Sequence, residues 1–231
     1  MSKRVLAFIF LLLFASAFNA YAETEDEYNF SWVDPDKKIY VIQNRKFTKA
    51  GHVGLFVSGA LNLSNPFKMA YAGIPRAAYW ISEAIGIEVF YAKEVNFDND
   101  TLKSLRTVNS TALPFVREHR SYYGALLSWS PWYGKVNFFN LIVYYDWFIN
   151  AGGGQLQTAL DINRSAYSPS NFQEETIPAV FFGTGYQFYL NNNFLLRLDL
   201  MGMGYSAKGA DNTTERIYTN WNFAAGLGLK L

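Results

Sequence analysis

Alternation of apolar and polar residues with a period of two recurs along this chain, from residue 52 almost to its last residue. In the stretch IGIEVFYAKE, residues 85–94, Ile85, Ile87 and Val89 occupy one set of alternate positions and Glu88 lies in the other. Because successive side chains of a strand point to opposite faces, each such stretch is predicted to be a strand with one apolar face. About eight stretches of this kind occur, and beyond the N-terminal residues no apolar run reaches the roughly 18 residues expected of a membrane-spanning helix.

The composition agrees with strands and argues against nucleic-acid binding. The 231 residues are 18% aromatic and include 17 glycines, with a net charge of only +1. Aromatic residues favour strands, whereas a nucleic-acid-binding protein needs a basic face. The chain has no cysteine, so no disulfide is expected to hold the fold.

The first residues have the pattern of a secretory signal peptide. Lys3 and Arg4 precede the apolar run VLAFIFLLLF, and small residues follow up to Ala22. We expect a signal peptide over residues 1–22, because an uncleaved anchor helix would need about 20 apolar residues. An acidic periplasmic N-terminal segment is then expected over residues 23–50, followed by a β-barrel over residues 51–231.

Short and long connections alternate between the expected strands. The short turns are ISEA (81–84), PWYG within SPWYGK (130–135) and NNN (191–193), and the long connections lie near residues 95–120, 156–176 and 206–216. Within the first long connection, DNDTLKSLR predicts a short helix, and a slip in the alternation near residues 138–140 predicts a bulge. Short turns at one rim and long loops at the other are typical of an outer-membrane barrel.

The two faces of the strands decide between a soluble and a membrane barrel. A soluble, lipocalin-like barrel that binds an apolar ligand would show the same alternation with its apolar face inward. Here, however, the polar face combines glycines with isolated charges, which suit a narrow lumen. The charged positions are Arg76, Glu88, Asp146, Arg197, Asp199 and Lys230. We therefore predict an all-β fold, a closed antiparallel up-and-down transmembrane β-barrel of about eight strands, whose interior is filled by side chains.

Three short motifs carry a resemblance to a known family. They are VIQNRKF (41–47), SPWYGK (130–135) and DWFINAGGG (146–154). With the general layout, which is similar to that of OmpA-like eight-stranded barrels, they resemble the outer-membrane β-barrel domain family of myxobacteria and related predatory or gliding bacteria. The resemblance implies a location in the bacterial outer membrane and leaves room for membership of an envelope protein complex. The last strand resembles the signal that the outer-membrane insertion machinery recognises, although it ends in Leu231 rather than Phe or Trp.

No catalytic, cofactor-binding or metal-binding residues are predicted. His52 is expected in the first strand with its side chain toward the lumen, and His119 in a loop segment beside Glu118 and Ser121. A Glu, a His and a Ser together are the groups of a nucleophilic site, but neighbouring side chains of an extended segment point apart. Two distant histidines without cysteine do not form a metal site, and AGGG (151–154) lacks the context of a phosphate loop and is interpreted as a strand end or a bend.

The charged residues of the polar face are predicted to form a network in the lumen. Arg76 lies five residues before the turn at residues 81–84 and Glu88 four residues after it, and so they are expected to face each other across adjacent strands. Arg197 with Asp199, and Asp146 farther round, would extend this network. It could serve as a gate or a proton path, but a plug that holds the barrel shut is the favoured interpretation.

The sequence therefore predicts a non-enzymatic integral outer-membrane β-barrel with a structural or partner-binding role in the cell envelope. The alternatives are a barrel enzyme that uses His119 on lipid or peptide, and a narrow ion pore. The expected partners are outer-membrane lipids, an envelope protein complex and, during assembly, the insertion machinery.

Overall fold

Eight strands and one helix make up the part of the chain that the computed structural model describes, namely residues 45–108, 114, 116–139, 141–161, 172–209 and 215–231. The elements are β1 (Val53–Asn62), β2 (Lys68–Trp80), β3 (Ile85–Asp98), α2 (Asp100–Val108), β4 (Arg117–Phe138), β5 (Leu141–Asp161), β6 (Phe172–Tyr189), β7 (Phe194–Lys208) and β8 (Glu215–Lys230). The expected signal peptide and most of the acidic N-terminal segment lie outside the described residues and stay predictions.

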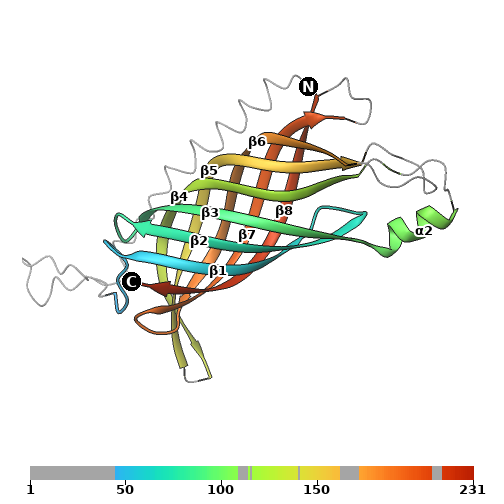
Figure 1. Ribbon diagram of the computed structural model, residues 1–231. Coiled ribbons are helices and arrows are strands. Elements are labelled where there is room, and N and C mark those ends of the chain that lie inside the picture. Colours follow the sequence, from blue (N-terminus) through green and yellow to red (C-terminus); the bar gives the residue numbers. More distant parts are fainter. Residues whose placement is uncertain (1–44, 109–113, 115, 140, 162–171, 210–214) are drawn as a thin grey trace, which may run out of the picture. The chain divides into compact units, whose positions relative to one another are not determined.

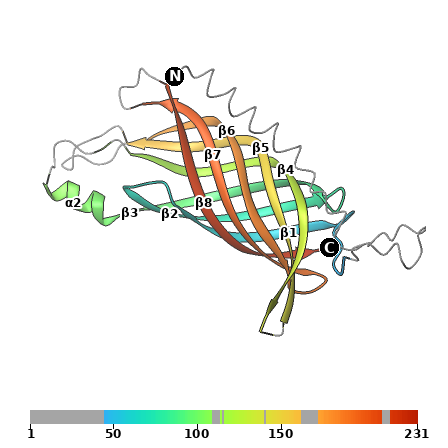
Figure 2. The same ribbon diagram turned by 180° about the vertical axis from the view of Figure 1, so that it is seen from behind.

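The sheet closes on itself (Figures 1 and 2). Each strand pairs antiparallel with its neighbour in the chain, and β1 also pairs with β8, so that Val57 lies opposite Leu227. No strand edge is therefore left open along the wall, as a bilayer requires. The prediction of a closed, eight-stranded, antiparallel up-and-down barrel is confirmed. In the described part of the chain, no helix is long and apolar enough to span a bilayer.

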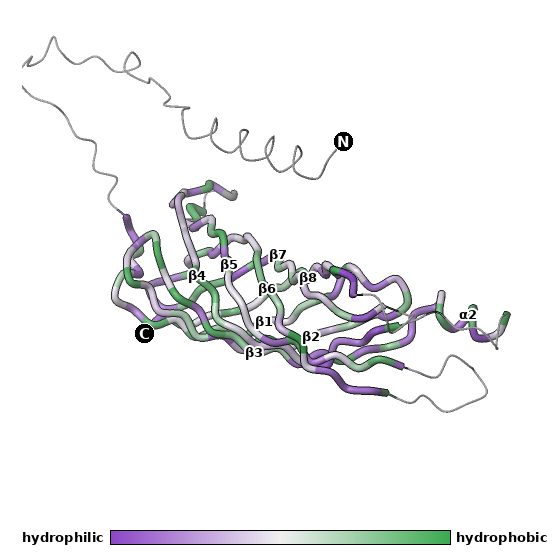
Figure 3. Tube along the Cα trace, turned by 90° about the horizontal axis from the view of Figure 1, so that it is seen from above, coloured by the Kyte–Doolittle hydropathy of each residue, from purple (hydrophilic) through white to green (hydrophobic). Residues whose placement is uncertain are grey.

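The apolar faces of the strands point outward. Val57, Val89 and Leu227 are among the large apolar side chains that are more than half exposed, whereas the charged Glu88 and Arg197 are buried inside. Figure 3 shows hydrophilic and hydrophobic residues alternating along the strands. A wall of this kind has hydrocarbon as its favourable surroundings, so the alternative of a soluble barrel with an apolar interior is wrong.

Two of the predicted short turns and the predicted helix are confirmed. Residues 81–84 join β2 to β3, and residues 190–193 join β6 to β7. The helix α2 follows β3 at the opposite rim, where the Asn99 side-chain oxygen accepts a hydrogen bond from the Leu102 N–H at 3.0 Å. An Asn side chain in this position caps the helix N-terminus. Strands extend well into the predicted long connections, since β6, for example, begins at Phe172.

The predicted turn at residues 130–135 and the predicted bulge at residues 138–140 are both wrong, because the two features are exchanged. β4 continues to Phe138, and its register with β5 shifts between Trp129 and Trp132. Pro131 lacks an N–H and is tolerated at a bulge, where one residue is left out of the ladder. The slip near residue 138 is the chain reversal itself, where Phe139 has a φ of 46°.

Glycines allow β4 and β5 to approach closely in the barrel wall. A Cβ atom at Gly152 would lie 2.0 Å from the Ala125 carbonyl oxygen, and one at Gly154 would lie 2.0 Å from that of Tyr123. Both glycines lie inside β5, so the segment AGGG is a close approach within a strand and not a strand end.

Replacing Gly152 by Ala should destabilise the barrel, because the new methyl group overlaps the Ala125 carbonyl oxygen and β4 must move. A loss of about 1–3 kcal/mol in the free energy of unfolding is expected, measured by urea titration with heat-modifiable gel mobility as readout. Gly73→Ala is the matched control, since a Cβ there meets no atom within 4 Å. Equal stability of the two variants would contradict the close approach.

Candidate functional site

Four charged side chains meet in the middle of the lumen, and we call them the lumen tetrad: Arg76 of β2, Glu88 of β3, and Arg197 and Asp199 of β7. Arg197 donates from Nη1 to Glu88 Oε1 and from Nε to Asp199 Oδ1, both at 2.7 Å. Arg76 Nη2 lies 2.7 Å from Asp199 Oδ2. All four are buried, and two positive charges balance two negative ones.

The contacts of the tetrad cross the lumen and do not follow one pair of adjacent strands. In the ladder between β2 and β3, Arg76 lies opposite Phe90 and Glu88 lies opposite Ala78. The direct approach of Arg76 to Glu88 is therefore diagonal, with Nη1 3.8 Å from Oε2. Each of the two has a nearer partner on β7, which adjacent-strand reasoning from the sequence did not find.

Aromatic rings enclose the two guanidinium groups. The Arg197 Cζ atom lies 4.2 Å from the centre of the Phe148 ring and 5.4 Å from that of Phe56. The Arg76 Cζ atom lies 5.9 Å from the centre of the Phe90 ring. A ring face attracts a cation, so these contacts hold the arginines in place and exclude water from the tetrad.

Asp146 belongs to a second cluster nearer the short-turn rim and not to the tetrad. Its carboxylate accepts hydrogen bonds from the Lys49 ammonium at 2.5 Å and from the Tyr189 hydroxyl at 2.6 Å. Lys49 also donates to the Ser130 hydroxyl at 2.9 Å, and Arg45 Nη1 lies 3.7 Å from Asp146. The structure thus brings four of the five predicted network residues together, while the fifth pairs with a lysine that sequence reasoning missed.

Lys49 reaches Asp146 because residues 45–50, here called the strap, pass across the short-turn mouth of the barrel. The Glu83 carboxylate accepts hydrogen bonds from the backbone N–H groups of Lys49 and Ala50, at 3.1 and 3.0 Å. The Phe47 ring stacks on the Tyr189 ring at 5.2 Å. Burial lowers the pKa of the Lys49 ammonium, and the nearby Asp146 carboxylate only partly offsets this effect. The strap therefore closes this mouth with a buried, paired charge.

An apolar layer fills the lumen on the other side of the tetrad. The Phe90 ring lies 5.1 Å from the Phe181 ring and 6.2 Å from the Tyr122 ring. The buried residues of this layer also include Ile74, Leu126, Leu156, Met201 and Met203. Along the strands this layer follows directly after the tetrad, since Met201 comes two residues after Asp199 on the same face of β7. The lumen is therefore closed by packing as well as by charge.

His119 lies within β4 and is buried, which corrects its predicted place in a loop. Its Nε2 atom lies 3.0 Å from the Tyr205 hydroxyl, and its Nδ1 atom lies 3.8 Å from Glu94. The strand extends beyond the predicted boundary because Arg117 and Glu118 continue the ladder with β5. His119 lines a cavity of about 240 Å³ at the long-loop mouth.

The Glu, His and Ser neighbours of this segment do not interact as a catalytic group. Glu118 pairs with Lys68 at 2.7 Å, and Ser121 donates to the Gln157 side chain at 2.5 Å. His52, predicted to face the lumen from the first strand, precedes β1, and its Nδ1 atom lies 3.0 Å from the Ala50 carbonyl oxygen. Among the residues described, no group of three or more His, Cys, Asp or Glu side chains is placed to hold a metal ion.

Comparisons with known proteins give weak likenesses only. No family model matches the chain, and no curated protein matches it. The N-terminal barrel domain of Pseudomonas aeruginosa OprF is 14% identical, over 79% of this chain and 98% of that one, with a TM-score of 0.46. Neisserial surface protein A is 14% identical, over 78% of this chain and 96% of that one, with a TM-score of 0.48. The attachment invasion locus protein Ail of Yersinia pestis is 12% identical, over 78% of this chain and 97% of that one, with a TM-score of 0.39.

The strand pairing and the lipid-facing wall establish the architecture by themselves. The fold is that of a small outer-membrane β-barrel. The protein's location is the bacterial outer membrane, where closed walls of this kind, with short turns at one rim and long loops at the other, reside. By this convention the short-turn rim is periplasmic. The narrower resemblance to the myxobacterial domain family stays a prediction.

Replacing Glu88 by Ala should destabilise the barrel, because Arg197 and Arg76 then lose a buried counter-charge. Removal of one member of a buried ion pair costs about 3–5 kcal/mol, so a clear fall in the thermal midpoint in detergent is expected. Glu174→Ala, at an exposed position of β6, is the control for loss of a carboxylate. An unchanged thermal midpoint for Glu88→Ala would show that the tetrad does not stabilise the barrel.

Proposed function

We propose that this protein is a non-enzymatic outer-membrane barrel whose role in the cell envelope is structural or partner-binding. The observation that carries this proposal is the filled lumen. The strap, the lumen tetrad and the apolar layer follow one another along the axis, and every charge of the tetrad has a partner within 2.7 Å. A barrel of eight strands has an interior only wide enough for side chains. Binding is therefore assigned to the rims and the outer wall.

The proposed partners are outer-membrane lipids along the wall, an envelope protein complex at the rims, and the insertion machinery during assembly. The long-loop rim offers an ordered polar surface for such a complex. There Lys68 pairs with Asp98 and Glu118, and Arg106 of α2 pairs with the same Asp98. These pairs hold α2 at the end of β3, where it extends from the barrel (Figure 1).

A narrow pore would conduct ions, whereas the filled lumen supports a barrel that does not conduct them. The wild-type protein in a planar bilayer should show no stepwise conductance, because an ion would have to pass both a paired charge cluster and the packed Phe90, Tyr122 and Phe181 rings. A wide porin added afterwards to the same membrane verifies the assay. Reproducible steps from the wild-type protein would contradict a closed lumen.

The alternative of a barrel enzyme depends on His119. Its partners are Tyr205 and Glu94, and no contact joins it to a hydroxyl of Ser121 in the described structure. His119→Ala should therefore leave the lipid A profile of expressing cells equal to that of the wild type. Heat-modifiable mobility of the variant confirms that it folds. A lipid A species that depends on His119 would overturn the non-enzymatic assignment.

A further inference from the structure

The hairpin between β4 and β5 continues beyond the periplasmic rim, and we call this extension the arm. It comprises residues 132–139 and 141–147. Its strands pair with each other from Trp132 opposite Trp147 to Phe138 opposite Leu141. The pairing of β3 with β4, in contrast, ends at Trp129, and that of β5 with β6 begins at Tyr144. The β4 edge of the arm is thus unpaired from Trp132 onward, and residues 136–138 and 141–143 pair only with each other in the described structure, at the bottom of Figure 1.

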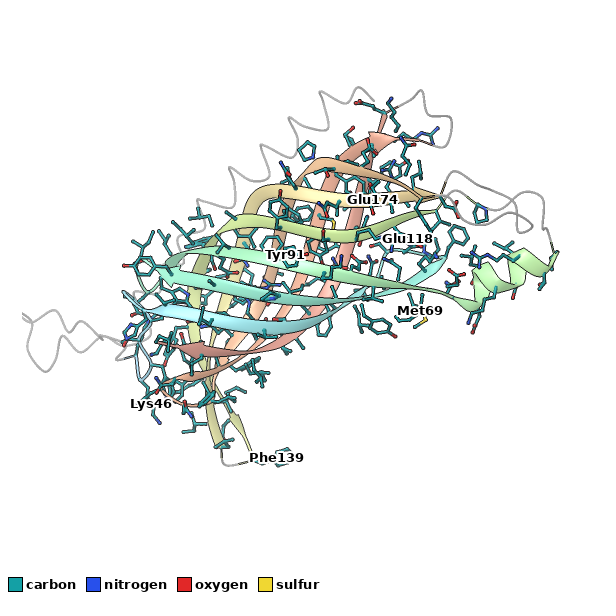
Figure 4. All side chains as sticks on the ribbon, in the orientation of Figure 1. Lys46, Met69, Tyr91, Glu118, Phe139 and Glu174 are labelled. Atoms are coloured by element: carbon teal, nitrogen blue, oxygen red, sulfur yellow. The ribbon has the colours of Figure 1, made fainter. Side chains whose placement is uncertain are left out.

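The other periplasmic connections are compact, which makes the arm exceptional. Residues 81–84 and 190–193 reverse the chain directly at the rim, as the short periplasmic turns of outer-membrane barrels do. On the β4 side, the six steps from Trp132 to Phe138 correspond to about 20 Å of strand, while on the β5 side residues 141–143 lie beyond the pairing with β6. Figure 4 shows Phe139 at the tip, well beyond the rim where Lys46 lies. A ribbon of this length needs a surface against which its apolar side chains can be buried.

The outward face of the arm continues the lipid-facing wall. Trp132 stacks on Trp147 with ring centres 4.6 Å apart. The Tyr145 ring covers Gly134, where a Cβ atom would lie 2.7 Å from the ring. Tyr145 in turn contacts the outward-facing Tyr186, with ring centres 5.7 Å apart. An aromatic surface therefore runs without interruption from the wall of β5 and β6 onto the arm, followed by Val136, Val143 and Leu141 on the same face.

The opposite face of the arm is mixed, with polar and cationic groups beside the exposed Ile142 and the rings of Tyr133 and Tyr144. Lys135 and Asn137 are exposed on it, and the Lys46 ammonium lies 5.4 Å from the centre of the Tyr144 ring. In the described part of the chain, neither Lys46 nor Lys135 forms a salt bridge. The nearby carboxylates of Glu83 and Asp146 are already paired with Arg45 and Lys49.

We propose that the arm is a membrane-seated anchor, whose outward face is buried in the periplasmic leaflet while Lys46 and Lys135 contact the phosphates of anionic phospholipid headgroups. Two observations favour lipid over a protein partner. The outward face of the arm is continuous with the wall that already contacts lipid. The cations, Lys135 of the arm and Lys46 of the strap, lie on the side turned away from the hydrocarbon. Tryptophan and tyrosine rings favour the membrane interface, and long lysine side chains reach from apolar surroundings to the headgroups.

Two adjacent strand positions test this orientation. The chain has no cysteine, so Leu141→Cys and Ile142→Cys each introduce a single site for a nitroxide label. The two side chains are 65% and 54% exposed and lie on opposite faces of the arm. The full-length protein is reconstituted in vesicles of phosphatidylethanolamine and phosphatidylglycerol. Accessibility of the label to oxygen and to a water-soluble nickel chelate is then measured. Val57→Cys on the wall is the lipid reference, and Lys103→Cys on α2 is the water reference.

The proposal predicts that the label at position 141 resembles the one at position 57, while the label at position 142 is accessible to the chelate. Equal chelate access at positions 141 and 142 would show that the arm stands in water and would overturn the proposal. Shielding of position 141 from both reagents would indicate a protein contact, such as a second copy, and would overturn it as well. A lipid-exposed label at position 57 in the same preparation shows that the barrel itself has inserted, so failure of the arm is distinguished from failure of the membrane assignment.

The lysines are tested in the same system. With Lys46 and Lys135 present, the label at position 141 should be more accessible to oxygen in vesicles that contain phosphatidylglycerol than in vesicles of phosphatidylcholine alone. Combined Lys46→Gln and Lys135→Gln substitution should abolish this difference. Persistence of the difference in the double variant would overturn the headgroup contact.

Discussion

Hydrogen bonding between β1 and β8 is the interaction on which the rest of the structure depends. It runs from Gly54 opposite Lys230 to Asn62 opposite Asn222 and removes the two edges that an open sheet would expose to lipid. Since an unpaired amide in hydrocarbon costs several kcal/mol, a chain with this exterior has no stable open form in a bilayer. Closure also sets the diameter, and the diameter of an eight-stranded barrel brings side chains from opposite walls into contact.

Those contacts across the lumen explain why the interior tolerates so much charge. Glu88 and Arg197 are separated by 109 positions in the chain, and each would be costly to bury alone. Their pairing with Asp199 and Arg76, under the rings of Phe56 and Phe148, gives a neutral group that is enclosed by aromatic side chains. At the periplasmic mouth, the strap likewise buries a compensated charge, because Lys49 is paired with Asp146. The interior is thus stabilised by compensated charges at two levels and by apolar packing at a third.

Because the interior is closed, the surfaces open to interaction lie on the exterior and at the rims. A lumen that is filled at three levels leaves the lipid-facing wall, the long-loop rim with α2 and the periplasmic arm as the surfaces for interaction. Of these, the arm carries the stacked Trp132 and Trp147 where it leaves the barrel wall. Its outward face is apolar, whereas its opposite face carries Lys135 and Asn137 beside tyrosine rings and Ile142.

The sequence by itself determined the class of fold, the direction of each face and the identity of the buried charges, because alternation along a strand is a local property of the backbone. Glu88 and Arg197 were assigned to the lumen from their neighbours in the chain alone. The partners of these charges were decided only by the tertiary structure, since closure of the barrel brings β3 and β7 together although they are not adjacent in the sheet. Lys49 was missed for the same reason, as its segment has no alternation and reaches Asp146 only across the mouth. The exchange of the bulge and the turn in the β4–β5 hairpin was likewise decided by the cross-strand register, which places Pro131 at the bulge and the reversal at Phe139.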